Sequence, residues 1–115
     1  MTTTDFENLS RDARSIILYA ESCMVEHAGL LEGERMNDAD IAALEVFKAE
    51  GLLDFGRIPG KLLGTFIGRR CTHWVEFNDP AWALAHRLRR TRSEQSRSTS
   101  VNYKKVRAEL DARAA

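Results

Sequence analysis

Apolar residues at three- and four-residue steps run through the first quarter of this 115-residue chain. This spacing places them on one face of an α-helix over residues 5–28, and Gly29 supplies a stop near its end. The chain is long enough to bury one modest core. We therefore expect a mainly helical domain built around this face, which comprises Phe6, Leu9, Ala13, Ile16, Ile17, Ala20, Met24 and Ala28.

A second helix has the clearest start signal in the chain. Asn37 can cap it and Asp40 lies at its third helical position. Ile41, Leu44 and Phe47 give the helix an apolar face, and Gly51 ends it.

Residues 52–70 are consistent with two structures. In the first, Pro59 starts a third helix over residues 59–67, with Leu62, Leu63, Phe66 and Ile67 on its buried face, and Gly68 lies beyond its end. In the second, residues 53–58 form a strand, Pro59 and Gly60 turn the chain, and the segment is one arm of a hairpin. We favour the helix. Residues 71–77 are rich in β-forming residues, which predicts a strand there.

The C-terminal third contains two helical patterns with a polar run between them. Asn78 or Asp79 caps the last core helix and Pro80 lies in its first turn. Residues 93–100 have the composition of a Ser/Arg-rich linker. The prediction is thus a domain over residues 1–92, a linker, and an amphipathic helix over residues 101–115, which docks on its own domain, a second copy or a partner.

Composition and motifs favour a binding protein over an enzyme. No glycine-rich phosphate loop, nucleophile elbow or His-Glu-x-x-His helix is present. The start has neither the basic nor the apolar region of a signal peptide, no stretch is long and apolar enough for a bilayer, and two cysteines are too few for a disulfide framework. We expect a cytoplasmic protein without a cofactor.

Charge is divided between the two halves of the chain. Residues 1–60 hold five Lys/Arg against twelve Asp/Glu, whereas residues 61–115 hold twelve against five. Such asymmetry indicates a nucleic-acid or acidic partner, because arginine forks suit phosphates. The alternative is that the halves neutralise each other, within one molecule or between copies. The predicted phosphate contacts are Arg57, Lys61, Arg69, Arg70, Arg87, Arg90 and Arg97.

One combination of metal-binding residue types is present. Cys23 and His27 share a face of the first helix, and Cys71 and His73 share a face of the predicted strand. Four such ligands suit tetrahedral zinc, but neither spacing matches a usual zinc clip. We therefore expect these residues to serve structure and predict no metal. Trp74 and Trp82 could stack on bases, although packing is the more common role of tryptophan.

The run from Asp40 to Arg90 resembles a winged-helix DNA-binding module at the level of pattern. Its first helix contains Leu44-Glu45-x-Phe47-x-x-Glu50-Gly51-Leu52-Leu53, a basic glycine-containing stretch follows, and Trp74-Val75-Glu76-Phe77-Asn78-Asp79 leads into another helix. The resemblance implies a recognition helix, either the acidic residues 38–50 or residues 59–67. We prefer the second register, in which Arg57, Lys61, Arg69 and Arg70 would contact DNA.

The leading interpretation is a winged-helix-like, mainly α protein that regulates transcription by binding nucleic acid as a homodimer. The alternative is a protein-binding accessory or inhibitor module, of the kind encoded by phages and other mobile elements. That module would act through its acidic first half, with Asp38, Asp40, Glu45 and Glu50 on its binding surface.

Overall fold

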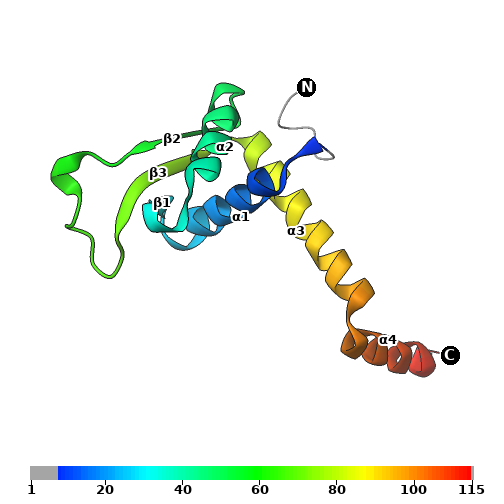
Figure 1. Ribbon diagram of the computed structural model, residues 1–115. Helices are drawn as coiled ribbons and strands as arrows, with labels where there is room; N and C mark the ends of the chain where they lie inside the picture. Colours follow the sequence, from blue (N-terminus) through cyan, green and yellow to red (C-terminus); the bar gives the residue numbers. More distant parts are fainter. Residues whose placement is uncertain (1–7, 115) are drawn as a thin grey trace.

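The structure is a computed structural model that describes residues 8–114. Within this range the chain forms four α-helices and a three-stranded antiparallel sheet, which confirms a mainly helical fold with a small β component (Figure 1). In chain order the elements are α1 (Arg11–Glu26), β1 (Leu30–Glu32), α2 (Asp38–Ala49), β2 (Leu53–Arg57), β3 (Cys71–Phe77), α3 (Asp79–Thr99) and α4 (Val101–Ala114).

Helix α1 is shorter than predicted at its start. The Ser10 side chain accepts a hydrogen bond from the Ala13 amide at 3.1 Å and so caps the helix. The predicted residues 5–7 lie outside the described range. At the other end the predicted stop is confirmed, because Gly29 has φ +84° and its amide donates to the carbonyl of Cys23 at 2.9 Å.

Helix α2 begins as its sequence predicts. The Asn37 side chain accepts from the Asp40 amide at 2.8 Å, and the Asp40 carboxylate accepts from the Asn37 amide at 3.0 Å. This reciprocal pair satisfies two amides that the helix itself leaves unbonded. Gly51 follows the helix with φ +80°. Leu44 and Phe47 are fully buried and hold α2 in the core.

The preferred helix over residues 59–67 is wrong, and the hairpin alternative is correct. β2 pairs antiparallel with β3, with Leu53 opposite Phe77 and Arg57 opposite His73. Between the strands, helical geometry is limited to one 3₁₀ turn at Gly60–Leu62. The backbone of Gly64 and Gly68 has φ near +80°, which no right-handed helix contains.

β3 is the central strand of the sheet. It pairs with β1 on one edge and with β2 on the other, in the order β1-β3-β2. Helices α1 and α2 pack against each other and against this sheet. The largest fully buried side chains of the resulting core are Phe47, Ile16, Ile17, Leu31, Leu44, Val75 and Cys23.

The predicted linker over residues 93–100 is also wrong. Residues 93–99 continue α3, and only Ser100 separates it from α4. The hydroxyls of Thr91 and Thr99 donate to the carbonyls of Arg87 and Gln95, four residues back, at 3.0 and 2.9 Å. A serine- and threonine-rich run without Gly or Pro can therefore remain helical.

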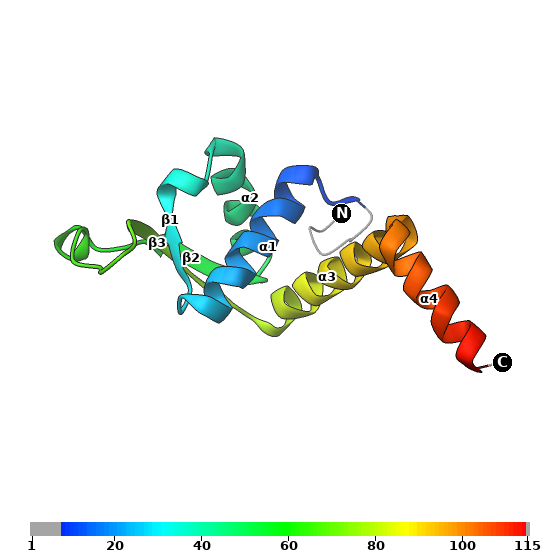
Figure 2. The same cartoon turned by 90° about the horizontal axis from the view of Figure 1, so that it is seen from below.

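The long α3 and α4 give the molecule its extended shape. The β2–β3 hairpin and α4 lie at opposite ends of the molecule in two perpendicular views (Figures 1 and 2), and the principal extents are 64 × 39 × 23 Å. None of the helices in residues 8–114 combines the length and apolar character needed to cross a membrane.

Replacing Gly29 by Ala should destabilise the fold by at least about 2 kcal/mol, because its backbone is left-handed and a Cβ would overlap the carbonyl oxygen of Val75. Gly60→Ala is the matched control, since a Cβ there meets nothing within 4 Å, and it should change stability by less than about 0.5 kcal/mol. Urea unfolding of both variants measures the difference. Equal stability of the two variants would show that the turn after α1 tolerates a side chain.

Candidate nucleic-acid interface

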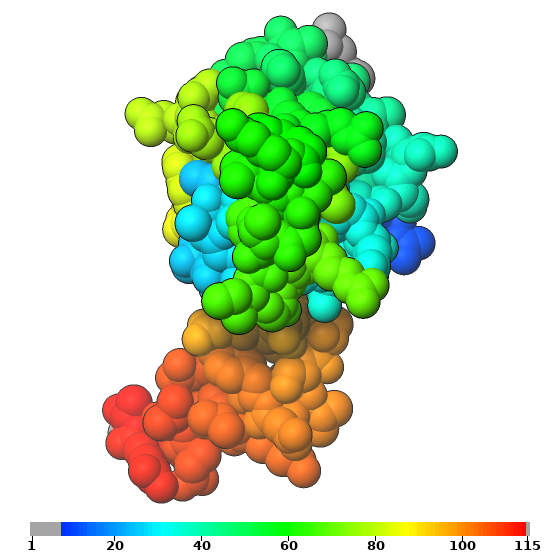
Figure 3. Space-filling view, turned by 90° about the vertical axis from the view of Figure 1, so that its left-hand side faces the viewer, coloured from blue at the N-terminus to red at the C-terminus, as the bar shows by residue number. Residues whose placement is uncertain are grey.

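The β2–β3 hairpin carries a group of positive charges that no carboxylate interrupts along the chain. Residues 57–70 contain Arg57, Lys61, Arg69 and Arg70 and no carboxylate. A view from the hairpin end shows this segment, in green, in front of the domain (Figure 3). The structure thus brings four of the seven predicted phosphate contacts onto one projecting element.

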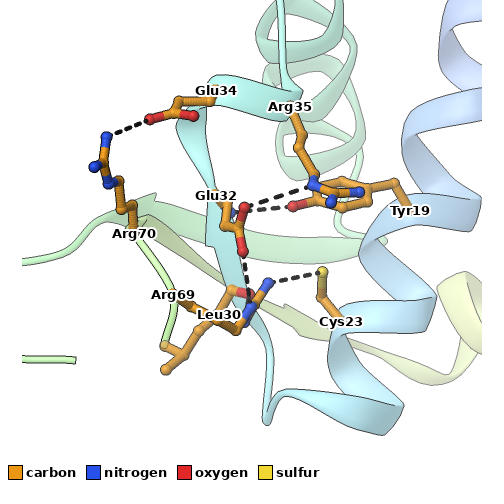
Figure 4. Close-up of polar contacts among 8 residues, drawn as sticks. All are labelled: Tyr19, Cys23, Leu30, Glu32, Glu34, Arg35, Arg69 and Arg70. Atoms are coloured by element: carbon orange, nitrogen blue, oxygen red, sulfur yellow. Dashed lines mark hydrogen bonds and ion pairs between the residues drawn. The ribbon is translucent and has the colours of Figure 1, made fainter. Parts of the chain in front are cut away.

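Arg69 is bound to the framework of the domain (Figure 4). Its Nε donates to Glu32 Oε1 at 3.0 Å, its Nη1 donates to the Leu30 carbonyl at 2.9 Å, and its Nη2 lies 3.8 Å from Cys23 Sγ. Its side chain is only 20% exposed. Because the guanidinium is directed toward β1 and α1, we place Arg69 among the residues that hold the hairpin and not among those that bind phosphate.

Glu32 is the anionic partner at the base of the hairpin. Besides Arg69, its carboxylate pairs with Arg35 at 3.5 Å. Its backbone amide donates to the Tyr19 hydroxyl at 3.1 Å, and burial raises the pKa of that hydroxyl. Because its half-buried carboxylate is held between two arginines, Glu32 anchors the hairpin to β1.

The other three hairpin cations are exposed. Arg70 pairs with Glu34 at 3.5 Å, but both side chains are at least 70% exposed, so the pair contributes little to stability. Arg57 and Lys61 make no ion pair with any residue in the range 8–114. Burial and the nearby Arg57 lower the pKa of His73, so its ring is neutral at pH 7. The hairpin therefore presents three accessible positive charges.

The tip of the hairpin is apolar. Leu62 and Leu63 are exposed and Ile67 is fully exposed, whereas Phe66 is partly covered. These are the side chains that the sequence assigned to the buried face of a helix. In the structure they extend beyond the core, and the hairpin presents apolar groups between its cations.

The arginines of α3 are distant from the hairpin tip. Arg87 and Arg90 are exposed on α3, and the Arg97 guanidinium lies 4.7 Å from the centre of the Tyr103 ring. The sequence missed the role of Arg89, which donates to Glu21, to Ser22 and to the carbonyl of Leu18. The predicted phosphate contacts consequently separate into a hairpin group and an α3 group (Figure 1).

The acidic residues of α2 also differ in their surroundings. Asp40 uses its carboxylate in the helix cap, and Glu50 lies just past the helix and has a partner of its own. Asp38 and Glu45 are exposed, and so is Val46 between them and the helix end. The solvent-facing surface of α2 is therefore acidic with an apolar residue, which disfavours contact with phosphates.

The cysteine and histidine residues do not form a metal site in the described chain. Cys23 and Cys71 are buried and have free thiols, and His27 is exposed at the end of α1. His73 Nδ1 lies 2.7 Å from Thr72 Oγ1. Within residues 8–114 no three His, Cys, Asp or Glu side chains are grouped as metal ligands. Burial raises the pKa of Cys71, so its thiol is protonated.

Both tryptophans have packing contacts. Trp82 meets Phe77 edge to face, with ring centroids 5.2 Å apart, and Trp74 covers Gly56 in the neighbouring strand.

No family model, curated protein or solved structure matches the chain.

Arg69 and Arg70 should respond very differently to substitution. Arg69→Ala leaves Glu32 half-buried without its closest cation and frees the Leu30 carbonyl, so we expect a loss of about 2 to 3 kcal/mol of folding free energy. Arg70→Ala removes an exposed pair and should cost less than about 0.5 kcal/mol. Thermal and urea unfolding measure both. Similar costs would contradict the anchoring role of Arg69.

Proposed function

We propose that this protein binds nucleic acid through the β2–β3 hairpin and acts as a regulator of transcription. The observation that carries the proposal is the group of exposed hairpin cations Arg57, Lys61 and Arg70, in a segment without carboxylates. Each phosphate that such a group neutralises releases counterions from the nucleic acid, which favours binding.

The arrangement of elements supports a winged-helix type of interface. α2 is followed directly by β2, the hairpin and β3, and then by α3. In this arrangement the hairpin takes the place of a wing, and α2 is the helix that precedes it. Because Asp38 and Glu45 are exposed on α2, we infer that the hairpin, and not α2, makes the principal contact with phosphates.

The contact between the hairpin cations and the phosphates is electrostatic, and it does not require recognition of a particular base sequence. Arg57 lies at the end of β2 and Lys61 in the following 3₁₀ turn, so both are placed by backbone structure. Arginine and lysine contacts to phosphate fix position on the duplex but carry little sequence information. The role in regulation would then depend on further contacts, for which the α3 residues Arg87, Arg90 and Arg97 remain candidates.

Replacing Arg57 and Lys61 together by Gln should weaken binding to a 20-base-pair duplex by about ten-fold or more at 0.1 M salt. The slope of log affinity against log salt should become shallower by about 2, since two phosphate contacts are lost. Fluorescence anisotropy over a range of salt concentrations measures both quantities.

The matched control is Arg107→Gln with Arg113→Gln, which removes the same charge from α4. These two arginines pair with Asp111 and Glu109 within the helix and lie far from the hairpin. The control should keep the wild-type salt slope. No binding of the wild-type chain to duplex at 50 mM salt, or equal losses in both double variants, would contradict the proposal.

A protein partner is the second candidate, and the exposed surface of α2 favours it. This surface combines Asp38 and Glu45 with Val46, whose side chain is 45% exposed. A basic surface with an apolar pocket would complement it. This binding mode needs neither Arg57 nor Lys61.

Charge reversal distinguishes the two candidates. Asp38→Lys with Glu45→Lys should abolish capture of a protein partner from nuclease-treated lysate and leave duplex binding intact or stronger, because the reversal adds positive charge. Arg57→Gln with Lys61→Gln should instead weaken duplex binding and leave capture of the protein partner intact. If the α2 reversal leaves every captured protein in place, the α2 surface is not a binding site.

A further inference from the structure

Helices α1 and α3 enclose a groove that is separate from both the hairpin and α2. Its volume is about 570 Å³, within the range of small-molecule sites. On α1 the lining positions include 11, 14, 15 and 18, and on α3 they are 88, 91, 92 and 95. Each set follows the helical repeat, so one continuous face of each helix is turned toward the groove.

The groove exists because the two helices diverge from a tightly packed end. At that end Leu18 and Leu88 are buried, and Arg89 connects α3 to Glu21 at 2.9 Å and to Ser22 at 2.8 Å. From there the helices spread apart toward the start of α1 (Figure 2). The wider end therefore lies beside the first turn of α1, where helix amides and the helix dipole favour anions.

The polar lining is positively charged. Arg11, Arg14 and Arg92 line the groove together with Ser15, Thr91 and Gln95, and within residues 8–114 no carboxylate is among the lining residues. The side chains of Arg11 and Arg92 are exposed and make no ion pair or hydrogen bond with any part of the chain that the structure describes. Like charges repel, so an anion between these guanidinium groups would relieve the repulsion.

The apolar lining indicates a ligand that is not a bare anion. Leu9, Leu18 and Leu88 supply an apolar floor beside the arginines. Guanidinium forks match the oxygen geometry of phosphate, and a leucine floor suits an aromatic or aliphatic body. We propose that this groove binds a phosphate monoester with an apolar or aromatic body, such as a mononucleotide or the phosphorylated end of a strand.

The proposal stands independently of nucleic-acid binding by the hairpin, since the two sites share no residue. Isothermal titration of the full chain with adenosine 5′-monophosphate tests it, with adenosine as the probe that lacks phosphate. We expect saturable binding of the monophosphate at least about ten-fold tighter than that of adenosine, because charge-assisted bonds to the phosphate are lost in adenosine.

Variants then locate the site. Arg11→Gln with Arg92→Gln should weaken binding of the monophosphate at least about ten-fold, whereas Arg107→Gln with Arg113→Gln on α4 should change it less than about two-fold. Arg11 and Arg92 are exposed, so their substitution leaves the core intact. Equal weakening by the two double variants would overturn the site. If the monophosphate binds no more tightly than adenosine, a mononucleotide is excluded as the ligand. The oligonucleotide probes with and without a 5′-phosphate then decide whether the groove binds phosphate.

A second pair of probes identifies the source of the phosphate. An oligonucleotide with a 5′-phosphate is compared with the same strand ending in a hydroxyl. If the phosphorylated strand binds more tightly and the advantage disappears in Arg11→Gln with Arg92→Gln, the groove recognises a strand end. If neither the strand pair nor the monophosphate pair shows a phosphate-dependent difference, the groove is not a phosphate site. Duplex binding by Arg57→Gln with Lys61→Gln reports separately on the hairpin.

Discussion

The central strand β3 is hydrogen-bonded along both edges, and the positions of the other elements depend on this double pairing. One edge carries β1, which leaves α1 through the left-handed turn at Gly29, and the amide of Val75 donates to the Gly29 carbonyl at 2.8 Å. The other edge carries β2, which follows α2 after Gly51. Both helices are thereby fixed against one sheet, and apolar side chains from each element share one core.

The role of each arginine depends on whether a carboxylate reaches it. Arg69 and Arg89 are joined to Glu32 and Glu21, with N···O distances of 3.0 and 2.9 Å, and each also donates to a backbone carbonyl of another element. Such bonds fix how elements pack. Arg57, by contrast, is the last residue of β2 that pairs with β3, and its side chain is exposed to solvent. Residues of one type thus divide into those that hold the fold and those that are available to a ligand.

The features that the sequence predicts well are local. The cap at Asn37 and the stop at Gly29 need only neighbouring residues, and both are confirmed. The segment 59–67 fails because its leucines and aromatic residue mimic a helix face, while the pairing that decides its structure involves β3. The same limit applies to the site. Arg69 and Glu32 are 37 positions apart, so counting charges along the chain cannot reveal that they pair.

The difference between paired and unpaired cations changes the interpretation of the acidic first half and the basic second half of the chain. Carboxylates from the acidic half neutralise particular cations of the basic half, as at Arg69–Glu32 and Arg89–Glu21, so part of the asymmetry serves cohesion within one molecule. Among the cations left over, Arg57 and Lys61 lie on the hairpin, and Arg11 and Arg92 line the α1–α3 groove. Neighbouring positive charges there raise the free energy of the folded state without stabilising any element. A ligand with negative charge would offset that cost at either place, and the two places are far enough apart to be occupied independently.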